Sequence, residues 1–227
     1  MSELLIRLKE NQDKTYQAFS KKLIPDTNFL IIGVRSPIIK KIAKEVSQDK
    51  ELYTKFFNEK HRYYEECLLH GAILGQLKTN ISEILTFLDG FMPYIDNWSV
   101  CDCTVLGLKI FKKHKDLVFS YVKNLLNSAN PYAVRFAIVT MLAYFLGDDF
   151  NEEVLTLAKS ACCNNYYVNM AIAWLYSVAL VKNYNQTIKY IENKNLPKFV
   201  HNKSIQKAKE SYRITADIKN YLNSLKI

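Results

Sequence analysis

Trp98 and Asp102 are the residues of this sequence whose types and spacing are best suited to chemistry. They are four positions apart, so on a helix both side chains lie on one face, one turn from each other. An indole ring attracts a cation through its quadrupole, and a carboxylate attracts it through its full charge. The pair therefore predicts a site for a positively charged group. The structural alternative is that Asp102 caps or pairs with a neighbouring helix, because a buried carboxylate needs a partner or water.

Four further residues are candidates for ligand contacts. The forked guanidinium of Arg135 suits a phosphate, although an ion pair with Asp102 is the alternative. Tyr166 and Tyr167 are consecutive aromatics, and only one of two adjacent helical residues can face a core, which leaves the other for a ligand. Trp174 lies eight positions after Tyr166, and tryptophan on a helix is more often a core residue than a platform for a ligand.

The elements that must position these residues repeat along the chain. Tyr64, Trp98, Tyr132 and Tyr166 are spaced by 34 residues, and they begin four similar words: YEECLL, WSVCDC, YAVRFA and YYVNMA. A fixed period of about 20 to 50 residues is typical of stacked repeats. None of the words contains glycine or proline, and small or apolar residues return every three or four positions, which predicts helices. The expected fold is all-α, an α-solenoid.

The repeat also aligns the candidate residues with one another. Arg135 takes the position of Cys101, and Asp102 takes the position that Phe136 and Met170 occupy in later copies. In a solenoid, equivalent positions of successive repeats lie along one wall. A carboxylate at a position that is otherwise apolar is therefore evidence for a site on that wall.

Helix ends are marked by recognisable residues. Ser36-Pro37 is expected to start one helix, as N-cap and first helical residue, after a short lead from Phe29. Asn130-Pro131 is expected to start another, and Asn164 to cap a third. No Gly/Ser/Pro-rich linker interrupts the chain, so residues 1–227 are expected to form one domain. The helices are predicted over 2–24 (one or two), 37–49, 50–58, 60–77, 80–90, 98–114, 116–128, 131–146, 151–162, 165–182, 184–193, 201–211 and 215–225.

The charge balance favours a negatively charged partner. The 31 Lys and Arg residues outnumber the 22 Asp and Glu residues, which gives a net charge of +9. Nucleic acid is the commonest such partner for a basic domain, and solubility charge is the alternative. Short helical groups hold many of the cations: Arg35, Lys40, Lys41 and Lys44; Lys112, Lys113 and Lys115; Lys203, Lys207, Lys209 and Arg213. Such groups are either solvated faces or contacts for a duplex backbone.

Several classes of protein are disfavoured. The chain has no apolar run of about 18 residues and its first helix carries acidic residues, so a cytoplasmic protein without a membrane partner is expected. The five cysteines include no Cys-x-x-Cys pair, so they are expected to be small core residues rather than disulfides or zinc ligands. Dinucleotide-binding, P-loop, zinc-protease and serine-hydrolase motifs are missing, so no metal or nucleotide cofactor is expected.

Five segments together resemble the DNA alkylation repair proteins of the AlkD type, which are built from HEAT-like repeats. The segments are FLIIGVRSP, NWSVCD, YAVRFAIVTML, YYVNMAIAW and FVHNKSIQKAKESYRI, and the resemblance spans about residues 20–215. It implies a monomeric HEAT-like solenoid with a concave basic groove for duplex DNA. It also implies a DNA glycosylase that removes N3- and N7-alkylated purines by hydrolysis of the N-glycosidic bond, in base excision repair.

The resemblance also implies roles for particular residues. Asp102 matches the family's catalytic aspartate, Trp98 and Trp174 match two tryptophans that pack on the deoxyribose of the lesion, and Arg135 matches an arginine that binds the DNA backbone. The aromatic pair at 166 and 167 matches residues near the DNA, and Arg35 is a further expected DNA contact. The sequence departs from the pattern at Ser99, where active members often have an acidic residue. It departs again at positions 169 and 170, where relatives often place a lysine.

Two alternative functions stay open at this point. The same basic wall suits a DNA-binding module without chemistry, for branched or damaged DNA. The 34-residue period also suits a protein-interaction solenoid of the tetratricopeptide kind, although its usual glycine and proline pattern is missing.

Overall fold

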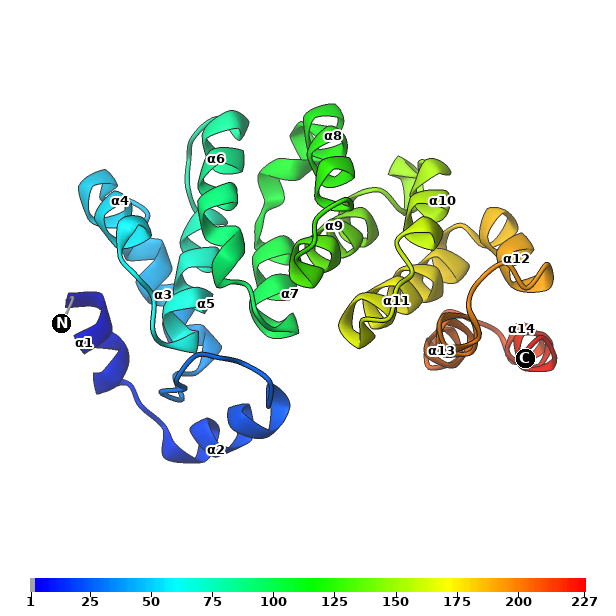
Figure 1. Cartoon of the computed structure of the whole chain (residues 1–227), viewed down its shortest axis with the longest axis horizontal. Helices are drawn as coiled ribbons and strands as arrows, with labels where there is room; N and C mark the ends of the chain where they lie inside the picture. Colours follow the sequence, from blue (N-terminus) through cyan, green and yellow to red (C-terminus); the bar gives the residue numbers. More distant parts are fainter. Residues whose placement is uncertain (1–2) are drawn as a thin grey trace. The chain divides into compact units, whose positions relative to one another are not determined.

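A computed structural model describes residues 3–227, and these residues are all-helical. They form fourteen α-helices and three short 3-10 helices, with one isolated backbone bridge between Leu30 and Tyr63 (Figure 1). Contacts divide the chain into two compact units, Met1–His114 and Lys115–Ile227, called unit 1 and unit 2 below.

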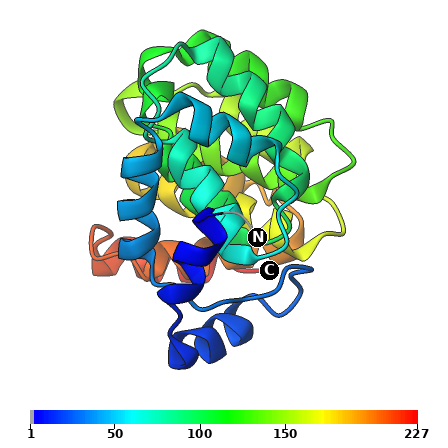
Figure 2. The same cartoon turned by 90° about the vertical axis from the view of Figure 1, so that its left-hand side faces the viewer.

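In unit 1, α5 packs between α3 and α7, and α4 and α6 also contact α5. The helix α2 lies at the edge of the unit in both views and buries only Ser20 among its residues (Figures 1 and 2). The elements of the unit are α1 (Glu3–Glu10), α2 (Lys14–Leu23), α3 (Ser36–Val46), α4 (Lys50–Asn58), α5 (Tyr64–Leu74), α6 (Ile81–Phe91), η1 (Met92–Tyr94), α7 (Trp98–Gly107) and η2 (Lys109–Lys113).

Small residues let α5 and α7 approach closely. A Cβ atom added to Gly71 would lie 2.0 Å from the Thr104 Oγ1 atom, and one added to Gly75 would lie 2.9 Å from the carbonyl oxygen of Gly107. Neither Gly71 in α5 nor Gly75, the residue after α5, has room for a side chain while α7 keeps its place. The position of α7, which carries Trp98 and Asp102, therefore depends on these glycines.

We expect Gly71→Ala to destabilise the protein by roughly 1–3 kcal/mol, because the added methyl group overpacks the contact with Thr104. Gly90→Ala is the matched control, since Gly90 is exposed in α6 and a Cβ there meets nothing within 4 Å. Alanine is the better helix former, so the control is expected to be neutral or more stable by up to about 1 kcal/mol. Urea unfolding of both variants checks this, and equal effects would contradict the packing argument.

Two buried histidines form a pair inside unit 1. The Nε2 atom of His61, just before α5, lies 2.8 Å from the Nδ1 atom of His70 on α5. The His70 ring stacks on Phe57 and on Phe91, at centroid distances of 4.0 and 4.2 Å. The outer nitrogens, His61 Nδ1 and His70 Nε2, have no hydrogen-bond partner among the described residues. A second proton on either ring would therefore be unsolvated.

Burial lowers the pKa of His61 to about 4. Burial, followed by repulsion from His61, lowers the pKa of His70 well below its usual range. Histidine in an unfolded chain titrates near 6.5, so the unfolded state takes up protons first as the pH falls. The stability that the neutral pair contributes is thus complete above about pH 6.5 and is lost as the pH falls toward about 4.

We expect the free energy of unfolding to fall across this window by up to roughly 1.4 kcal/mol per pH unit for each histidine. Urea unfolding between about pH 7 and about pH 5 measures the slope. The double variant His61→Gln/His70→Gln should reduce the slope of stability against pH. His114→Gln serves as the control, because His114 is not part of the buried histidine pair. The same slope in wild type and double variant would show that other groups cause the pH dependence.

In unit 2, α11 packs between α9 and α13, while α8 packs on α9, α10 and α12 on α11, and α14 on α13. The elements are α8 (Lys115–Leu125), α9 (Pro131–Tyr144), η3 (Gly147–Asp149), α10 (Glu153–Ser160), α11 (Tyr166–Lys182), α12 (Tyr184–Glu192), α13 (Lys198–Lys209) and α14 (Ala216–Ser224).

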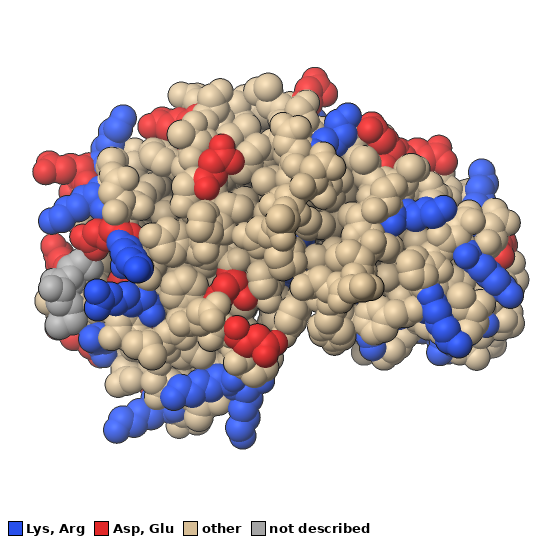
Figure 3. All heavy atoms as spheres, viewed as in Figure 1, with Lys and Arg blue, Asp and Glu red and all other residues tan. Residues whose placement is uncertain are grey.

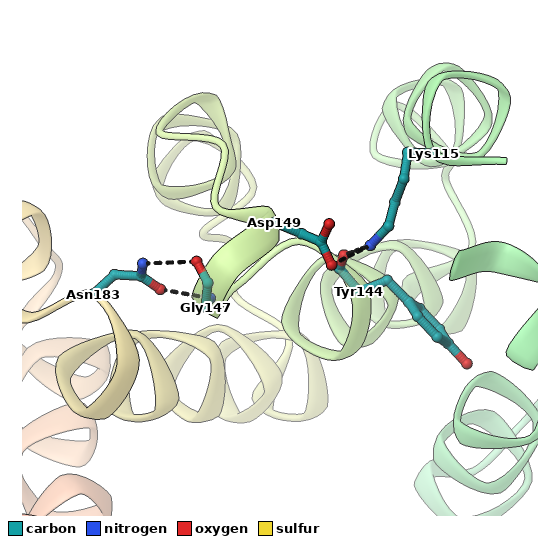
Figure 4. Close-up of polar contacts among 5 residues, drawn as sticks. All are labelled: Lys115, Tyr144, Gly147, Asp149 and Asn183. Atoms are coloured by element: carbon teal, nitrogen blue, oxygen red, sulfur yellow. Dashed lines mark hydrogen bonds and ion pairs between the residues drawn. The ribbon is translucent and has the colours of Figure 1, made fainter. Parts of the chain in front are cut away.

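Side chains bind the end of α9 and the segment after it to the start of α8 and to the residue after α11 (Figure 4). The Lys115 Nζ atom donates to the carbonyl oxygen of Tyr144 at the end of α9 and lies 3.1 Å from an Asp149 carboxylate oxygen. The amide of Asn183, the residue after α11, brackets Gly147: its Oδ1 accepts from the Gly147 N–H at 2.8 Å, and its Nδ2 donates to the Gly147 carbonyl at 3.2 Å. These contacts satisfy backbone groups that helix ends otherwise leave unpaired.

The predicted helices are confirmed in existence and order, with differences at their ends. The 34-residue spacing marks equivalent points, since Tyr64, Trp98 and Tyr166 begin α5, α7 and α11, and Tyr132 stands second in α9. The predicted helix 98–114 was wrong in extent, because α7 ends at Gly107 and a 3-10 helix follows. The helix predicted over 201–211 corresponds to α13, which begins three residues earlier, at residue 198.

The predicted caps were right once in three cases. Asn130 caps α9 by accepting from the Tyr132 N–H. Asn165, rather than Asn164, caps α11, because its Oδ1 accepts from two N–H groups in the first turn. The helix α3 includes Ser36, so its N-cap is Arg35.

Of the five cysteines, two are buried, one is partly buried and two are exposed. Cys67 and Cys101 are buried as predicted, but Cys103 and Cys163 are exposed, so the core assignment was wrong for them. Cys103 shares the exposed face of α7 with Leu106, three positions later.

Lysine and arginine side chains lie over α2 in unit 1 and over α12 to α14 in unit 2 (Figure 3). Among the described residues no helix is both long and apolar enough to span a bilayer.

Candidate active site

The helix α7 presents Trp98 and Asp102 on one stripe. Its first turn is capped by Asn97, whose Oδ1 accepts from the Val100 N–H at 3.0 Å. Trp98, Asp102 and Leu106 follow at intervals of four along the helix. Trp98 is half-buried, Asp102 is 8% exposed and Leu106 is 52% exposed. The carboxylate is thus shielded, but it lies on a stripe that reaches the surface.

The indole of Trp98 is held in place by the end of α2. Its Nε1 atom donates to the carbonyl oxygen of Leu23 at 3.2 Å. Beside it, the Asp96 carboxylate accepts from the Thr27 hydroxyl at 2.9 Å and from the Asn28 N–H at 2.6 Å. These three contacts join the end of α2 and the segment after it to the start of α7. Sequence reasoning missed Asp96, which lies outside the repeated words.

Ser99, where the family pattern often has an acidic residue, has a local structural role. Its Oγ atom lies 2.7 Å from the hydroxyl oxygen of Tyr64 at the start of α5, and both residues are buried. Burial is also the main reason that the pKa of Tyr64 is raised above its usual value. A carboxylate at position 99 would bury a charge beside a neutral hydroxyl. Serine avoids that cost and still forms the hydrogen bond with Tyr64.

Arg35 lies in unit 1 at the start of α3 and is bound within the protein. Its Nε and Nη2 atoms lie 2.9 and 2.8 Å from one carboxylate oxygen of Asp13, and its guanidinium lies 5.1 Å from the centre of the Tyr16 ring. The pKa of Asp13 is lowered, first by the hydrogen bond from the Tyr16 N–H and then by Arg35. Arg35 itself is exposed, so its outer face is accessible.

Unit 2 holds the other predicted residues. Arg135 on α9 is 6% exposed, and its Nη1 atom donates to the carbonyl oxygen of Tyr167 at 2.7 Å. Tyr167 also packs against Tyr132, with ring centroids 5.8 Å apart. Tyr166 is 57% exposed and contacts the Phe199 ring at 5.9 Å. Of the two consecutive tyrosines, one is half-buried and the other faces outward, as the sequence predicted.

Trp174 is half-buried in the middle of α11, so it is not a fully enclosed core residue. The Ser177 hydroxyl donates to the Trp174 carbonyl at 2.7 Å, one turn further along the helix. The structure therefore brings Trp98 together with Asp102 in unit 1, and Arg135 together with the tyrosine pair in unit 2. In the part of the chain that is described, no group of three or more His, Cys, Asp or Glu side chains is arranged to hold a metal ion.

Comparison with known proteins places the chain in a family. A search of individual curated proteins found no match. The family model described as "DNA alkylation repair enzyme" matches residues 2–208, which is nearly the whole chain and includes both helices that carry the predicted tryptophans. The chain belongs to the DNA alkylation repair enzyme family.

Proposed function

We propose that the protein is a DNA glycosylase that excises cationic N3- and N7-alkylated purines from duplex DNA. The observation that carries the proposal is the stripe on α7, where the shielded Asp102 carboxylate lies one turn from the half-exposed Trp98 indole. Family membership supports a role in DNA repair. The stripe on α7 supports a specific reaction, because the Trp98 indole and the Asp102 carboxylate both attract positive charge.

Excision of a cationic purine requires mainly that the enzyme stabilise positive charge on the sugar. An alkylated purine already carries a positive charge, so it leaves without protonation by a general acid. As the N-glycosidic bond breaks, positive charge develops on the deoxyribose, and a fixed carboxylate stabilises that charge most where water is excluded. In this proposal Asp102 stabilises the oxocarbenium-like sugar and orients the attacking water, while Trp98 and Trp174 pack against the sugar.

DNA binding is assigned to the basic helices. We propose that the helix pairs stack as HEAT-like repeats and hold the duplex in a concave basic groove. Arg135, Tyr166, Tyr167 and Arg35 are the proposed contacts to the DNA. The exposed ring of Tyr166 and the exposed side of Arg35 support this, because both are free to meet a ligand on their outer faces. Arg135 is included because the family pattern has an arginine there; in the structure its side chain is 6% exposed and donates to the Tyr167 carbonyl oxygen.

The test is release of free base from duplex DNA treated with a methylating agent, with 3-methyladenine and 7-methylguanine resolved. We expect the wild-type protein to release at least one of them in a time-dependent reaction that leaves abasic sites. Untreated duplex is the control and should yield no free base. Folded protein that binds the treated duplex and releases neither base would instead favour the non-catalytic DNA-binding module.

A further inference from the structure

The hydrogen-bond partner of the Trp98 indole lies at the end of α2, which is weakly packed. The Trp98 Nε1 atom donates to the carbonyl oxygen of Leu23, the last residue of α2, at 3.2 Å. Carbonyls in the last turn of a helix have no partner within the helix, so this one is available to the indole. Within α2 only Ser20 is buried, and the residue that follows the helix, Ile24, is buried as well. Apolar packing therefore does little to fix the carbonyl that the indole binds.

Asp96, two residues before Trp98, binds the segment that follows α2. One of its carboxylate oxygens accepts from the Thr27 hydroxyl at 2.9 Å, and the other accepts from the Asn28 N–H at 2.6 Å. We call these contacts of Asp96 with Thr27 and Asn28 the Asp96 clamp. Thr27 lies only four residues after Leu23 in the sequence. The clamp therefore fixes the end of α2 to the same stretch of chain that carries the indole.

A third donor joins Asp96 to the start of α7. The Asn97 side-chain Nδ2 atom donates to an Asp96 carboxylate oxygen at 2.8 Å, while the Asn97 Oδ1 atom caps α7 through the Val100 N–H. The Asp96 carboxylate thus connects the cap of α7 with the segment after α2. Because donors from within the protein already occupy both of its oxygens, Asp96 is suited to holding other groups in place rather than to contact with a substrate.

We propose that Asp96 is a positioning residue for Trp98: its carboxylate fixes the end of α2, and the Leu23 carbonyl at that end fixes the indole. The indole has a single N–H, which lies in the plane of the ring, so one hydrogen bond to a fixed acceptor sets the orientation of the ring face. The proposal rests on the proposed function in one respect, since an oriented indole one turn from Asp102 aids a reaction in which positive charge develops beside both groups.

The first measurement uses Trp174→Phe protein as the parent, because Trp98 is then the only tryptophan. In this parent, Thr27→Val and Asp96→Ala each break the clamp. Each is expected to increase the quenching of Trp98 fluorescence by acrylamide and to lower its anisotropy, because the ring gains motion on the nanosecond timescale. Thr27→Ser keeps the hydroxyl and is expected to match the parent. The double variant Thr27→Val/Asp96→Ala is expected to match Asp96→Ala, because the two side chains act through one contact.

Two matched controls lose a hydrogen bond elsewhere in unit 1. Thr86→Val removes a hydroxyl that donates to the Ser82 carbonyl within α6, and Asp49→Ala removes a carboxylate that caps α4. Both are expected to leave the quenching and anisotropy of Trp98 at the parent values. Unchanged fluorescence in the two clamp variants, with unit 1 folded by circular dichroism, would overturn the proposal. A change as large in either control would also overturn it, because general loosening of unit 1 would then explain the effect.

A second arm measures base release from methylated duplex by variants that keep both tryptophans. Since misplacing a positioned group by about 1 Å costs up to about 100-fold, Asp96→Ala is expected to lower the single-turnover rate at saturating protein roughly 10- to 100-fold, with duplex affinity unchanged. Thr27→Ser is expected to keep the wild-type rate. A wild-type rate in Asp96→Ala would overturn the positioning role. Absence of base release by the wild-type protein would refute the proposed function alone, because the fluorescence arm contains no DNA and still tests how the indole is held.

Discussion

Replacing Asp102 with asparagine is expected to lower the rate of base excision by roughly 100- to 1000-fold, the cost of removing one preorganised charge from an active site. Asparagine keeps the shape of the side chain and removes the negative charge that would stabilise the developing oxocarbenium ion. The residue is 8% exposed, so little water is present to replace that charge. Base release under single-turnover conditions measures the effect.

Two controls separate chemistry from folding and binding. Asp148→Asn removes the same charge from an exposed residue of η3 and is expected to leave excision unchanged. Asp102→Asn itself should bind methylated duplex with the affinity of wild type and unfold at a similar urea concentration. If excision survives in Asp102→Asn, the carboxylate is not the catalytic group. A large loss of stability in the variant, by contrast, would favour the structural alternative for Asp102.

The second large effect is expected at Glu65, a carboxylate in the middle of unit 1. Glu65 is 0% exposed, and its oxygens accept from three consecutive backbone N–H groups, those of Ile32 at 2.9 Å, Gly33 at 2.7 Å and Val34 at 3.3 Å. Burial raises the pKa of this carboxyl, and the hydrogen bonds from Ile32 and Gly33 oppose that rise. Within residues 3–227 the isolated bridge between Leu30 and Tyr63 does not extend to residues 32 to 34, whose N–H groups bind Glu65.

We expect Glu65→Ala to lower the free energy of unfolding by about 3 kcal/mol or more, because each unsatisfied buried donor costs roughly 1–3 kcal/mol. Urea unfolding measures the change. Glu51→Ala, an exposed position in the first turn of α4, is the matched control and is expected to stay within about 0.5 kcal/mol of wild type. Similar losses in both variants would show that Glu65 does not hold the segment.

Glu65 also illustrates how the candidate site depends on distant parts of the chain. The segment that it binds leads directly into Arg35, and the Gly33 carbonyl accepts from the Asp13 N–H at 2.8 Å, just before α2. Gly33 has a φ of +95°, and a Cβ there would lie 2.5 Å from the Asp13 carbonyl oxygen, so glycine is required. Loss of Glu65 is thus expected to disturb the Arg35–Asp13 contact as well as the stability of unit 1.

The sequence alone determined the helices and the pairing of Trp98 with Asp102, because both depend on interactions between residues a few positions apart. Apolar periodicity, proline at a helix start and the asparagine cap at position 130 act within one or two turns. The 34-residue spacing found equivalent helix starts for the same reason. Trp98 and Asp102 share one face of α7 because they are four residues apart, and this does not depend on any other helix.

How the segment after α2 and the side chains of the site are held depends on contacts between distant parts of the chain. Residues 29–34 have the composition of a strand, yet their N–H groups bind Glu65, more than thirty positions away. The Trp98 indole donates to Leu23, and Arg135 donates to Tyr167, across separations that no local pattern encodes. A buried polar group must find a partner, but its sequence neighbours do not specify which one, because packing of distant helices brings that partner into reach.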